Sequence, residues 1–517
     1  MTTAATANRA LPGSAAPGGE GLDFTAKLVL AGGTLVAAYL LAAPVALLFI
    51  AALRGPPDTL PFEPEAVWSL ANFSAVYADP VLYQVIIPST LIFAAGSVAL
   101  AFTLAFTLAW LIERTDLPGR GGWFAMILMP LLVPTSITAI AWIFLLGPRA
   151  GWLNIWIRGL LGLSGDGPAN VFSMGGLIFC QGLATTPFIF LLLTATLKTM
   201  NSSFEEASSA SGGRPLATFL RVTLPVLMPG LLAPVILALL ITLEQFEIPL
   251  IIGQAARINV FSYRIWYELN PSSGLPNYGR AAAMSLPFLA LGLLLLTFYN
   301  RMIRRSERFV TVTGKAYRPK RIVLGAWRWP ALAFASLYVA LAAVLPAAIL
   351  LWTSFFGYEP LSLAALPDFS LKAYGTLIDS GAFWLAARNT LMVALLSALI
   401  VTAIGGLLGW IIVRTRLWAR HVVDILSFLS VGIPSVIAGL AVMLVYLSIP
   451  IGIYGTVWIL VLAYSYRFAV TTRITRAGLM QIHRELEEAS AASGARWLTS
   501  QRRVLLPLLA PSLMSAF

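Results

Sequence analysis

The sequence predicts an all-α polytopic membrane protein, and three observations support this class. Hydrophobic residues make up 59% of the 517 residues and charged residues only 11%, whereas soluble proteins carry about 25% charged residues. Apolar runs of about 20 residues, the length that crosses a bilayer as a helix, recur along the chain. The net charge of +12 is spread between these runs, which argues against a soluble enzyme, a disordered protein and a nucleic-acid-binding protein.

Ten apolar runs predict transmembrane helices. Residues 1–27, rich in Ala, Gly, Pro and Thr, predict a disordered cytoplasmic tail. Residues 301–328 hold nine Lys and Arg and predict a basic cytoplasmic linker. The predicted spans are 28–53, 86–113, 123–147, 173–197, 226–252, 282–300, 329–353, 389–413, 422–447 and 456–472.

The basic residues predict the orientation of these spans. With the N-terminus in the cytoplasm, 26 of the 34 Lys and Arg fall on the cytoplasmic side. Cytoplasmic loops of membrane proteins carry such an excess of positive charge. We therefore expect a multi-pass protein of the cell inner membrane with a cytoplasmic N-terminus.

The chain contains an internal repeat. Trp110, Arg114-Thr115 and Pro134 match Trp410, Arg414-Thr415 and Pro434 at an offset of 300 residues. Further along, Glu205-Glu206-Ala207-Ser208 matches Glu487-Glu488-Ala489-Ser490 at an offset of 282. The first copy therefore has about 18 extra residues, which we assign to the loop at 148–172. Two similar helix bundles in tandem are expected.

The repeat divides the chain into a first half, residues 28–300 with six spans, and a second half, residues 329–517 with four. The first half continues for about 75 residues after Pro225, whereas ten residues follow the matching Pro507. We interpret the second half as truncated, with two helices missing at its C-terminus. The alternative is a genuine ten-helix protein.

Two cytoplasmic loops share one motif with identical spacing. Each contains a Glu-Ala-Ser triplet, a glycine four residues after its serine, and a Leu-Pro pair. This pattern predicts a short helix, a glycine turn with φ > 0, and a second helix that stops at the proline. The motif residues are Glu206, Ala207, Gly212, Leu224 and Pro225 in the first loop, and Glu488, Ala489, Gly494, Leu506 and Pro507 in the second.

This pattern resembles the E-A-A–G–L-P signature of importer-type ABC transporter permeases, with Ser208 and Ser490 in place of the second alanine. The resemblance extends over nearly the whole chain as two fused permease halves. It implies that the motif loops are coupling helices for two copies of a separate ATPase, with a solute-binding protein outside the membrane. The alternative is an ordinary amphipathic cytoplasmic hairpin.

No catalytic role is expected for the chain itself. A phosphate-binding loop of the form G-x-x-x-x-G-K-[ST] does not occur in the sequence. ATP hydrolysis is therefore assigned to the separate subunit. No cofactor and no metal-ligand set are predicted.

The segment from Glu244 to Gly253 suggests a substrate. It resembles a run in ferric-iron uptake permeases, although Ser262-Tyr263 stand where two threonines are expected. Glu244 and Glu247 fall late in an apolar span, where a carboxylate is costly and often functional, and carboxylate oxygen suits a hard cation. They are therefore candidates for the substrate path. The alternative is that they pair with Arg257 or Arg264 near the outer interface.

Other substrates and mechanisms remain open from the sequence. Related fused permeases serve thiamine, phosphonates or polyamines. A secondary transporter driven by an ion gradient would also show a repeat and broken helices, but it should carry more charged residues in mid-membrane. An intramembrane enzyme is less favoured, because no cluster of His, Asp and Glu falls within the spans.

Overall fold

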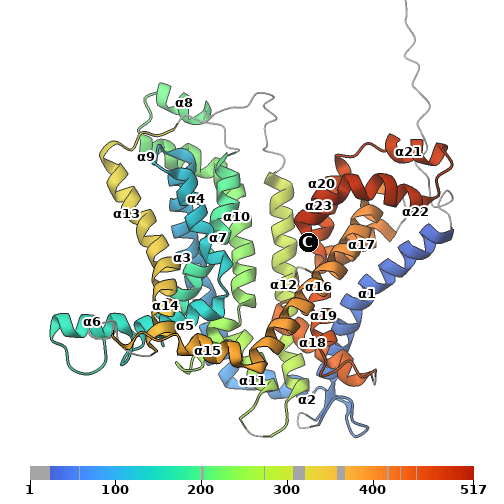
Figure 1. Cartoon of the computed structure of the whole chain (residues 1–517), viewed down its shortest axis with the longest axis horizontal. Coiled ribbons are helices and arrows are strands. Elements are labelled where there is room, and N and C mark those ends of the chain that lie inside the picture. The colour runs from blue at the N-terminus through green and yellow to red at the C-terminus, as the bar shows by residue number, and fades with distance from the viewer. Residues whose placement is uncertain are drawn as a thin grey trace, which may run out of the picture. The chain divides into compact units, whose positions relative to one another are not determined.

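The computed structural model describes residues 24–56, 59–198, 203–272, 274–306, 321–357, 367–415, 419–430, 432–449 and 451–517. These residues are mostly helical (Figure 1), with one two-stranded antiparallel sheet of β1 (Arg54–Gly55) and β2 (Val67–Trp68). The all-α membrane class is confirmed, since a helix satisfies its backbone hydrogen bonds within one segment. Most of the predicted tail and residues 307–320 of the predicted linker lie outside the described residues.

Six continuous helical segments in the described residues are long and apolar enough to cross a membrane. They coincide with six of the predicted spans. They are α1 (Phe24–Leu53), η1 (Leu82–Ile86) with α3 (Ile87–Arg114), α7 (Met174–Lys198), α12 (Tyr278–Ser306), η6 (Gly325–Trp327) with α13 (Arg328–Val339), η7 (Ala340–Val344) and α14 (Leu345–Phe356), and α16 (Gly381–Arg414).

Two further predicted spans are bent helix pairs, which bring the described spans to eight if each pair counts as one. The helix α4 (Arg120–Leu128), continued by η2 (Met129–Leu132), meets α5 (Thr135–Leu146) at 95°. The second pair, Pro215–Met228 and Gly230–Glu244, is bent by 60°. Pro134 precedes α5 directly, and proline both lacks an N–H and disfavours helical geometry at the residue before it.

The last two predicted spans are divided into shorter helices. Residues 422–447 hold parts of α17 (Ala419–Leu429) and α18 (Ser435–Ser448), and residues 456–472 hold α19 (Val457–Ser465) and the start of α20 (Ala469–Met480). Pro434 stands at the first break and Arg467 at the second. The total of ten spans, and the two further helices, therefore stay predictions.

The chain forms two compact units. The first unit comprises 49–384 with 434–437, and the second comprises the described part of 1–48 with 385–433 and 438–517. These units differ from the predicted sequence halves, because α13 and α14 contact α4 and α5 in the first unit while α1 up to Leu48 belongs to the second. Homology between segments does not decide which segments pack together. The boundaries at 28–300, 301–328 and 329–517 stay a prediction about the repeat.

The core of the first unit is the packing of α3 against α7. Gly96 and Gly182 allow the two helices to approach closely, since a Cβ at either position would lie 2.6 Å from a side chain of the partner helix. Small residues have this role in membrane helix pairs, where lipid removes the hydrophobic driving force and dispersion contacts hold the helices together. The second unit repeats the arrangement at Gly405 and Gly409 of α16, against α20.

The two motif loops contain the same series of elements. The first has α8 (Ser203–Ala210), α9 (Pro215–Thr218), η3 (Phe219–Thr223) and α10 (Leu224–Glu244). The second has α21 (Glu485–Ala492), α22 (Trp497–Ser500), η9 (Gln501–Leu505) and α23 (Leu506–Ala516). In each unit the loop lies at one end of the spanning helices, α8 beside the end of α3 and α21 beside the end of α16 (Figure 1).

Shorter helices occupy the remaining connections. The helix α6 (Trp152–Leu161) lies in the extra segment 148–172, and η4 (Pro249–Gly253) follows α10. The others are α2 (Ala71–Tyr77), α11 (Phe261–Leu269) and α15 (Lys372–Asp379).

Candidate functional site

The glycine of each motif adopts the left-handed conformation that the sequence predicts. Gly212 has φ of +82° and Gly494 has φ of +80°. Each follows the short motif helix, α8 or α21, and reverses the chain before the next helix. An L-residue with a Cβ pays a steric penalty in this region, so glycine suits both turns.

The expected end of the second helix at the proline is wrong in both loops. Pro225 and Pro507 are the second residues of α10 and α23, which continue directly from the π-helical turns η3 and η9. Because proline has no N–H and its ring crowds the carbonyl of the preceding turn, the helix widens locally instead of ending. Leu224 and Leu506 are the first residues of α10 and α23.

A buried ion pair ties the first motif loop to a membrane helix. Arg114, the last residue of α3, is 1% exposed and bonds through its guanidinium to the carboxylate of Glu205 in α8. The other carboxylate oxygen of Glu205 accepts a hydrogen bond of 2.9 Å from the hydroxyl of Thr223. The guanidinium also lies 5.7 Å from the ring centre of Trp110. Glu205 therefore joins the end of α3, the motif helix α8 and the end of η3, which leads into α10.

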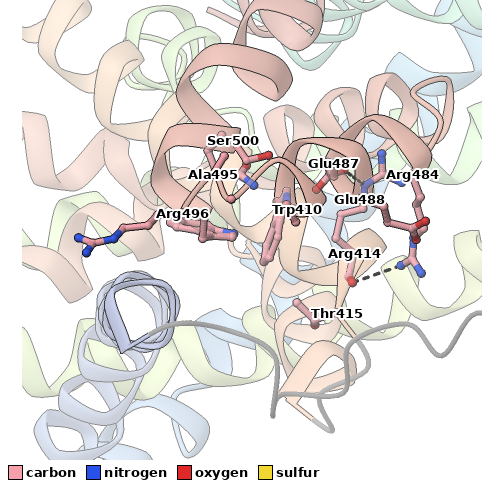
Figure 2. Close-up of a pocket in the computed structure, with 13 residues that line it drawn as sticks. Trp410, Arg414, Thr415, Arg484, Glu487, Glu488, Ala495, Arg496 and Ser500 are labelled. Carbon is pink, nitrogen blue, oxygen red and sulfur yellow. Dashed lines mark hydrogen bonds and ion pairs between the residues drawn. The ribbon is translucent and has the colours of Figure 1, made fainter.

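The second motif loop repeats this ion pair with different supporting contacts. Nε of Arg414, whose side chain is 7% exposed, lies 2.7 Å from Oε1 of Glu487 in α21 (Figure 2). Arg414 also donates to the carbonyl of Ile482 at 2.8 Å, and Arg484 donates to the carbonyl of Arg414 at 3.2 Å. Arg484 thus satisfies a carbonyl at the C-terminal end of α16, where helix carbonyls lack partners.

The motif predicted from the sequence contains Glu206 and Glu488, which are the neighbours of the glutamates that form the ion pairs. Glu205 and Glu487 face inward, whereas the predicted Glu206 and Glu488 are exposed, as are Ala207 and Ala489. Neighbouring residues on a helix point about 100° apart, so only one of two adjacent glutamates can reach the arginine. Arg114 and Glu205 correspond to Arg414 and Glu487 in the second repeat. This correspondence could have identified the pair from the sequence.

The outward side of each loop also exposes apolar residues at corresponding positions. Phe204 and Leu216 are exposed in the first loop, and Leu486 and Leu498 in the second. These pairs are related by the same offset of 282 as the motif itself. Contiguous exposed apolar surface can mark a site that contacts another protein.

The loops differ beneath the motif helix. A cavity of about 410 Å³ lies under the second loop, with Trp410, Arg414 and Trp497 in its wall (Figure 2). The rings of Trp410 and Trp497 meet edge to face at 5.5 Å. In the first loop Phe219 packs against Trp110 at 5.3 Å, and Gln501 occupies the position that corresponds to Phe219. The two loops therefore pack different aromatic residues on the matching tryptophans, Phe219 on Trp110 in the first and Trp497 on Trp410 in the second.

The two acidic residues predicted for the substrate path lie at a break in the membrane helices. Glu244 is the last residue of α10, and Glu247 begins the helical turn that leads into η4, so the two residues flank the break at residues 245–246. The exposed carboxylate of Glu247 accepts hydrogen bonds from the hydroxyl of Thr135 and from the N–H of Ser136, the latter at 2.9 Å. Both donors belong to the first turn of α5, whose partial positive charge favours a carboxylate.

The surroundings of these residues are polar. The side-chain amide of Gln245 donates to the hydroxyl of Thr135 at 3.1 Å, and Ser262 donates to the carbonyl of Gln245 at 2.7 Å. Ser435, at the start of α18, lies 3.5 Å from the carboxylate of Glu244. The alternative partner Arg264 forms its ion pair with Glu268 at 2.7 Å. Within the described ranges no group of three or more His, Cys, Asp and Glu is placed to hold a metal ion.

Known proteins similar to this chain include ferric transport permeases. FbpB 1 of Haemophilus influenzae, whose name places it in a ferric transport system, is 26% identical over 443 residues, covering 84% of this chain and 68% of that protein. The ferric transport system permease protein FbpB of Actinobacillus pleuropneumoniae is 25% identical over 441 residues, covering 84% of this chain and 62% of that protein. The chain thus spans about two thirds of the length of these relatives.

A third relative has a different named substrate. The trehalose/maltose transport system permease protein MalF of Thermococcus litoralis is 30% identical over 226 residues, which cover 42% of this chain and 72% of that protein. Residues 117–308 and 401–517 each match one family of transport proteins, so both motif loops lie within matched segments. The chain belongs to the family of binding-protein-dependent transport system inner membrane components and is a permease subunit of the ABC importer type.

Proposed function

We propose that this permease subunit carries ferric iron across the inner membrane and that a separate ATPase drives it by docking on the two motif loops. The observation that supports docking most directly is the matched outward surface of the loops. Glu206 and Ala207 are exposed in the first loop, and Glu488 and Ala489 are exposed at the corresponding positions of the second. Two equivalent surfaces are suited to two copies of one ATPase, and the excess of basic residues predicted for this side supports a cytoplasmic location.

The docking surface combines shape with apolar contact. Ala207 and Ala489 leave a slim helix side that can enter a groove, and the exposed Leu216 and Leu498 lie on the helix that follows each turn. Inside the loop, the buried arginine holds the motif helix to the end of a membrane helix. Closure of an ATPase pair would therefore move both loops and change the packing of the helices attached to them.

Docking can be tested with charged residues on the apolar surface. In the double variant Leu216→Asp with Leu498→Asp, we expect co-purification of the ATPase with the detergent-solubilised importer to fall at least tenfold. Leu275→Asp changes an exposed leucine of the segment between α11 and α12 and is the matched control. Unchanged co-purification in the double variant would refute docking at these loops.

Iron as the substrate rests on the names of two relatives and on the carboxylates at the helix break. Glu244 and Glu247 could contact a hard cation on the substrate path, because oxygen ligands suit Fe³⁺. A solute-binding protein outside the membrane would deliver the cation. The experiment is uptake of radioactive ferric iron by cells or vesicles that contain the whole importer. Uptake should stop on ATP depletion and continue when the proton gradient is collapsed.

The opposite energy dependence would favour a secondary transporter driven by an ion gradient. A second candidate substrate is a disaccharide, which the similarity to the trehalose/maltose permease favours. The uptake assay should therefore include maltose, together with thiamine, a phosphonate and a polyamine. ATP-dependent uptake of one of these, without iron uptake, would keep the importer mechanism and reject iron.

A further inference from the structure

An apolar cavity lies between α5, α6 and α14 in the first unit. Its volume is about 340 Å³. All of its lining residues are apolar: Leu145, Trp152, Leu153, Ile155, Trp156, Leu345, Ala348 and Ile349. Protein interiors contain few voids larger than a water molecule, and a water molecule needs two to four polar partners, whereas this lining is mostly apolar. A space of this size and chemistry is suited to an apolar occupant.

The floor of the cavity is the helix that only the first repeat has. The polar side of α6 is bound to its own loop, because Asn154 donates to the carbonyls of Gly147 at 2.9 Å and Ala169 at 2.6 Å. Arg158 donates to the carbonyl of Gly165 at 2.6 Å. The apolar side, with Trp152 and Trp156, borders the cavity. The extra segment 148–172 thus builds one wall of this space.

The position of α6 indicates that this wall lies at the surface of the bilayer. In the first unit α6 runs across the direction of α3 and α7, at the end of the bundle away from α8 (Figure 1). Trp156 is 73% exposed at the rim, and Leu160 and Leu161 are also exposed. Amphipathic helices that carry tryptophan beside leucine lie in the headgroup region of membranes. Val344 at the end of η7 and Leu351 in α14 are exposed apolar residues of the same continuous helical segment.

We propose that the cavity binds an acyl chain of a membrane phospholipid beneath the interfacial helix α6. A helix of a partner protein is about 10 Å across with its side chains, too wide for a space of about 340 Å³. An acyl chain is narrow, flexible and already present at this surface. Transfer of the chain from bulk lipid brings no hydrophobic gain. Retention instead depends on dispersion contacts with the wall, including Trp152, whose ring meets Trp352 at 5.5 Å.

Retained lipid can be counted by native mass spectrometry of the purified importer after detergent exchange. The wild type should retain one phospholipid more than Ala348→Phe, which fills the cavity from α14. Ala347→Phe adds the same ring at a neighbouring exposed position that does not line the cavity, and it should retain lipid as the wild type does. Equal retention in all three proteins would overturn the proposal.

A second measurement does not depend on filling the cavity. A photoreactive diazirine analogue of leucine at position 345 should form a covalent adduct with phospholipid after detergent exchange. The same analogue at position 351, on the exposed surface of α14, should lose its adduct, because lipid there exchanges freely. Cross-linking from position 345 to protein, or equal loss of the adduct at both positions, would contradict the site. ATPase docking and substrate choice do not enter either measurement.

Discussion

The guanidinium of Arg114 is buried against the carboxylate of Glu205, and this contact joins the end of a membrane helix to the first motif loop. The second repeat contains the same pair, Arg414 with Glu487. Under the proposed docking of an ATPase, the loop cannot move far from the helix without leaving a buried charge unpaired. The pair therefore makes the loop and the helix move together, which is what transmission of an ATPase movement requires.

We predict that Glu205→Ala lowers the free energy of unfolding and abolishes uptake. Removing one partner of a buried ion pair costs about 3–5 kcal/mol, and because Glu205 is 22% exposed we expect the lower end of this range. The measurements are thermal unfolding in detergent and ATP-driven uptake. Asp166→Ala is the control, since it breaks the exposed pair with Arg149, and exposed pairs contribute about 0–1 kcal/mol.

Coupling is separated from stability by two further variants. Glu205→Gln keeps the size of the side chain and an acceptor for Thr223 but removes the charge. ATPase co-purification should persist in this variant while uptake falls at least tenfold. The double variant Arg114→Glu with Glu205→Arg exchanges the two charges. It should restore part of the uptake that Glu205→Gln loses. If uptake followed thermal stability alone across these variants, the pair would be structural only.

The glycine turns give a prediction about backbone conformation. Gly212→Ala should destabilise the first motif loop by about 1–2 kcal/mol, because φ of +82° is unfavourable for a residue with a Cβ. A Cβ there would meet no atom within 4 Å, so the effect is conformational. Gly121→Ala, in helix α4 and equally unobstructed, should instead stabilise by up to about 1 kcal/mol. The rate of proteolysis of the first motif loop, measured in both variants at one temperature, reports the difference. Equal protection from proteolysis in the two variants would contradict the prediction.

The sequence predicted the positions of the membrane helices well and their breaks poorly. Runs of apolar residues identify α7 and α16 directly, because composition decides whether a segment enters the bilayer. The 95° bend before α5 could not be predicted in the same way. Pro134 was visible, but a proline can kink, widen or end a helix, depending on the groups that replace the lost hydrogen bond. Here Glu247, more than 100 residues away, supplies an acceptor at the start of α5.

Within the motif loops, the pattern predicted the turn but not the internal contacts. Gly212 and Gly494 adopt the predicted conformation, because positive φ is a local backbone requirement that glycine meets without steric cost. Whether Glu205 or Glu206 pairs with Arg114 depends on how the loop packs against the end of α3. That is a property of the tertiary structure and is not encoded in the local pattern. For the same reason the repeat pattern could not show that α14, from the second repeat, packs on α5, from the first.

Close packing of α3 and α7 predicts a large effect at Gly182. In Gly182→Val the new Cβ would lie 2.6 Å from Cδ2 and 3.1 Å from Cβ of Leu100. The side chain of Leu100 cannot rotate away from a contact with its own Cβ, so the helices must separate, at a cost of about 1–3 kcal/mol. Gly122→Val, which would meet no atom within 4 Å, is the control. Thermal unfolding with similar midpoints for both variants would argue against close packing.

Substitution of Glu247 distinguishes a structural carboxylate from one on the substrate path. Glu247→Ala removes the acceptor for Ser136 and should cost about 0.5–2 kcal/mol, as loss of a helix N-cap does. Glu247→Gln keeps an acceptor oxygen and removes only the charge. If the carboxylate meets a cation, Glu247→Gln should lower ferric uptake at least tenfold at equal expression, with little change in thermal stability. If it only caps α5, uptake should be nearly normal in Glu247→Gln and reduced in Glu247→Ala in proportion to lost stability.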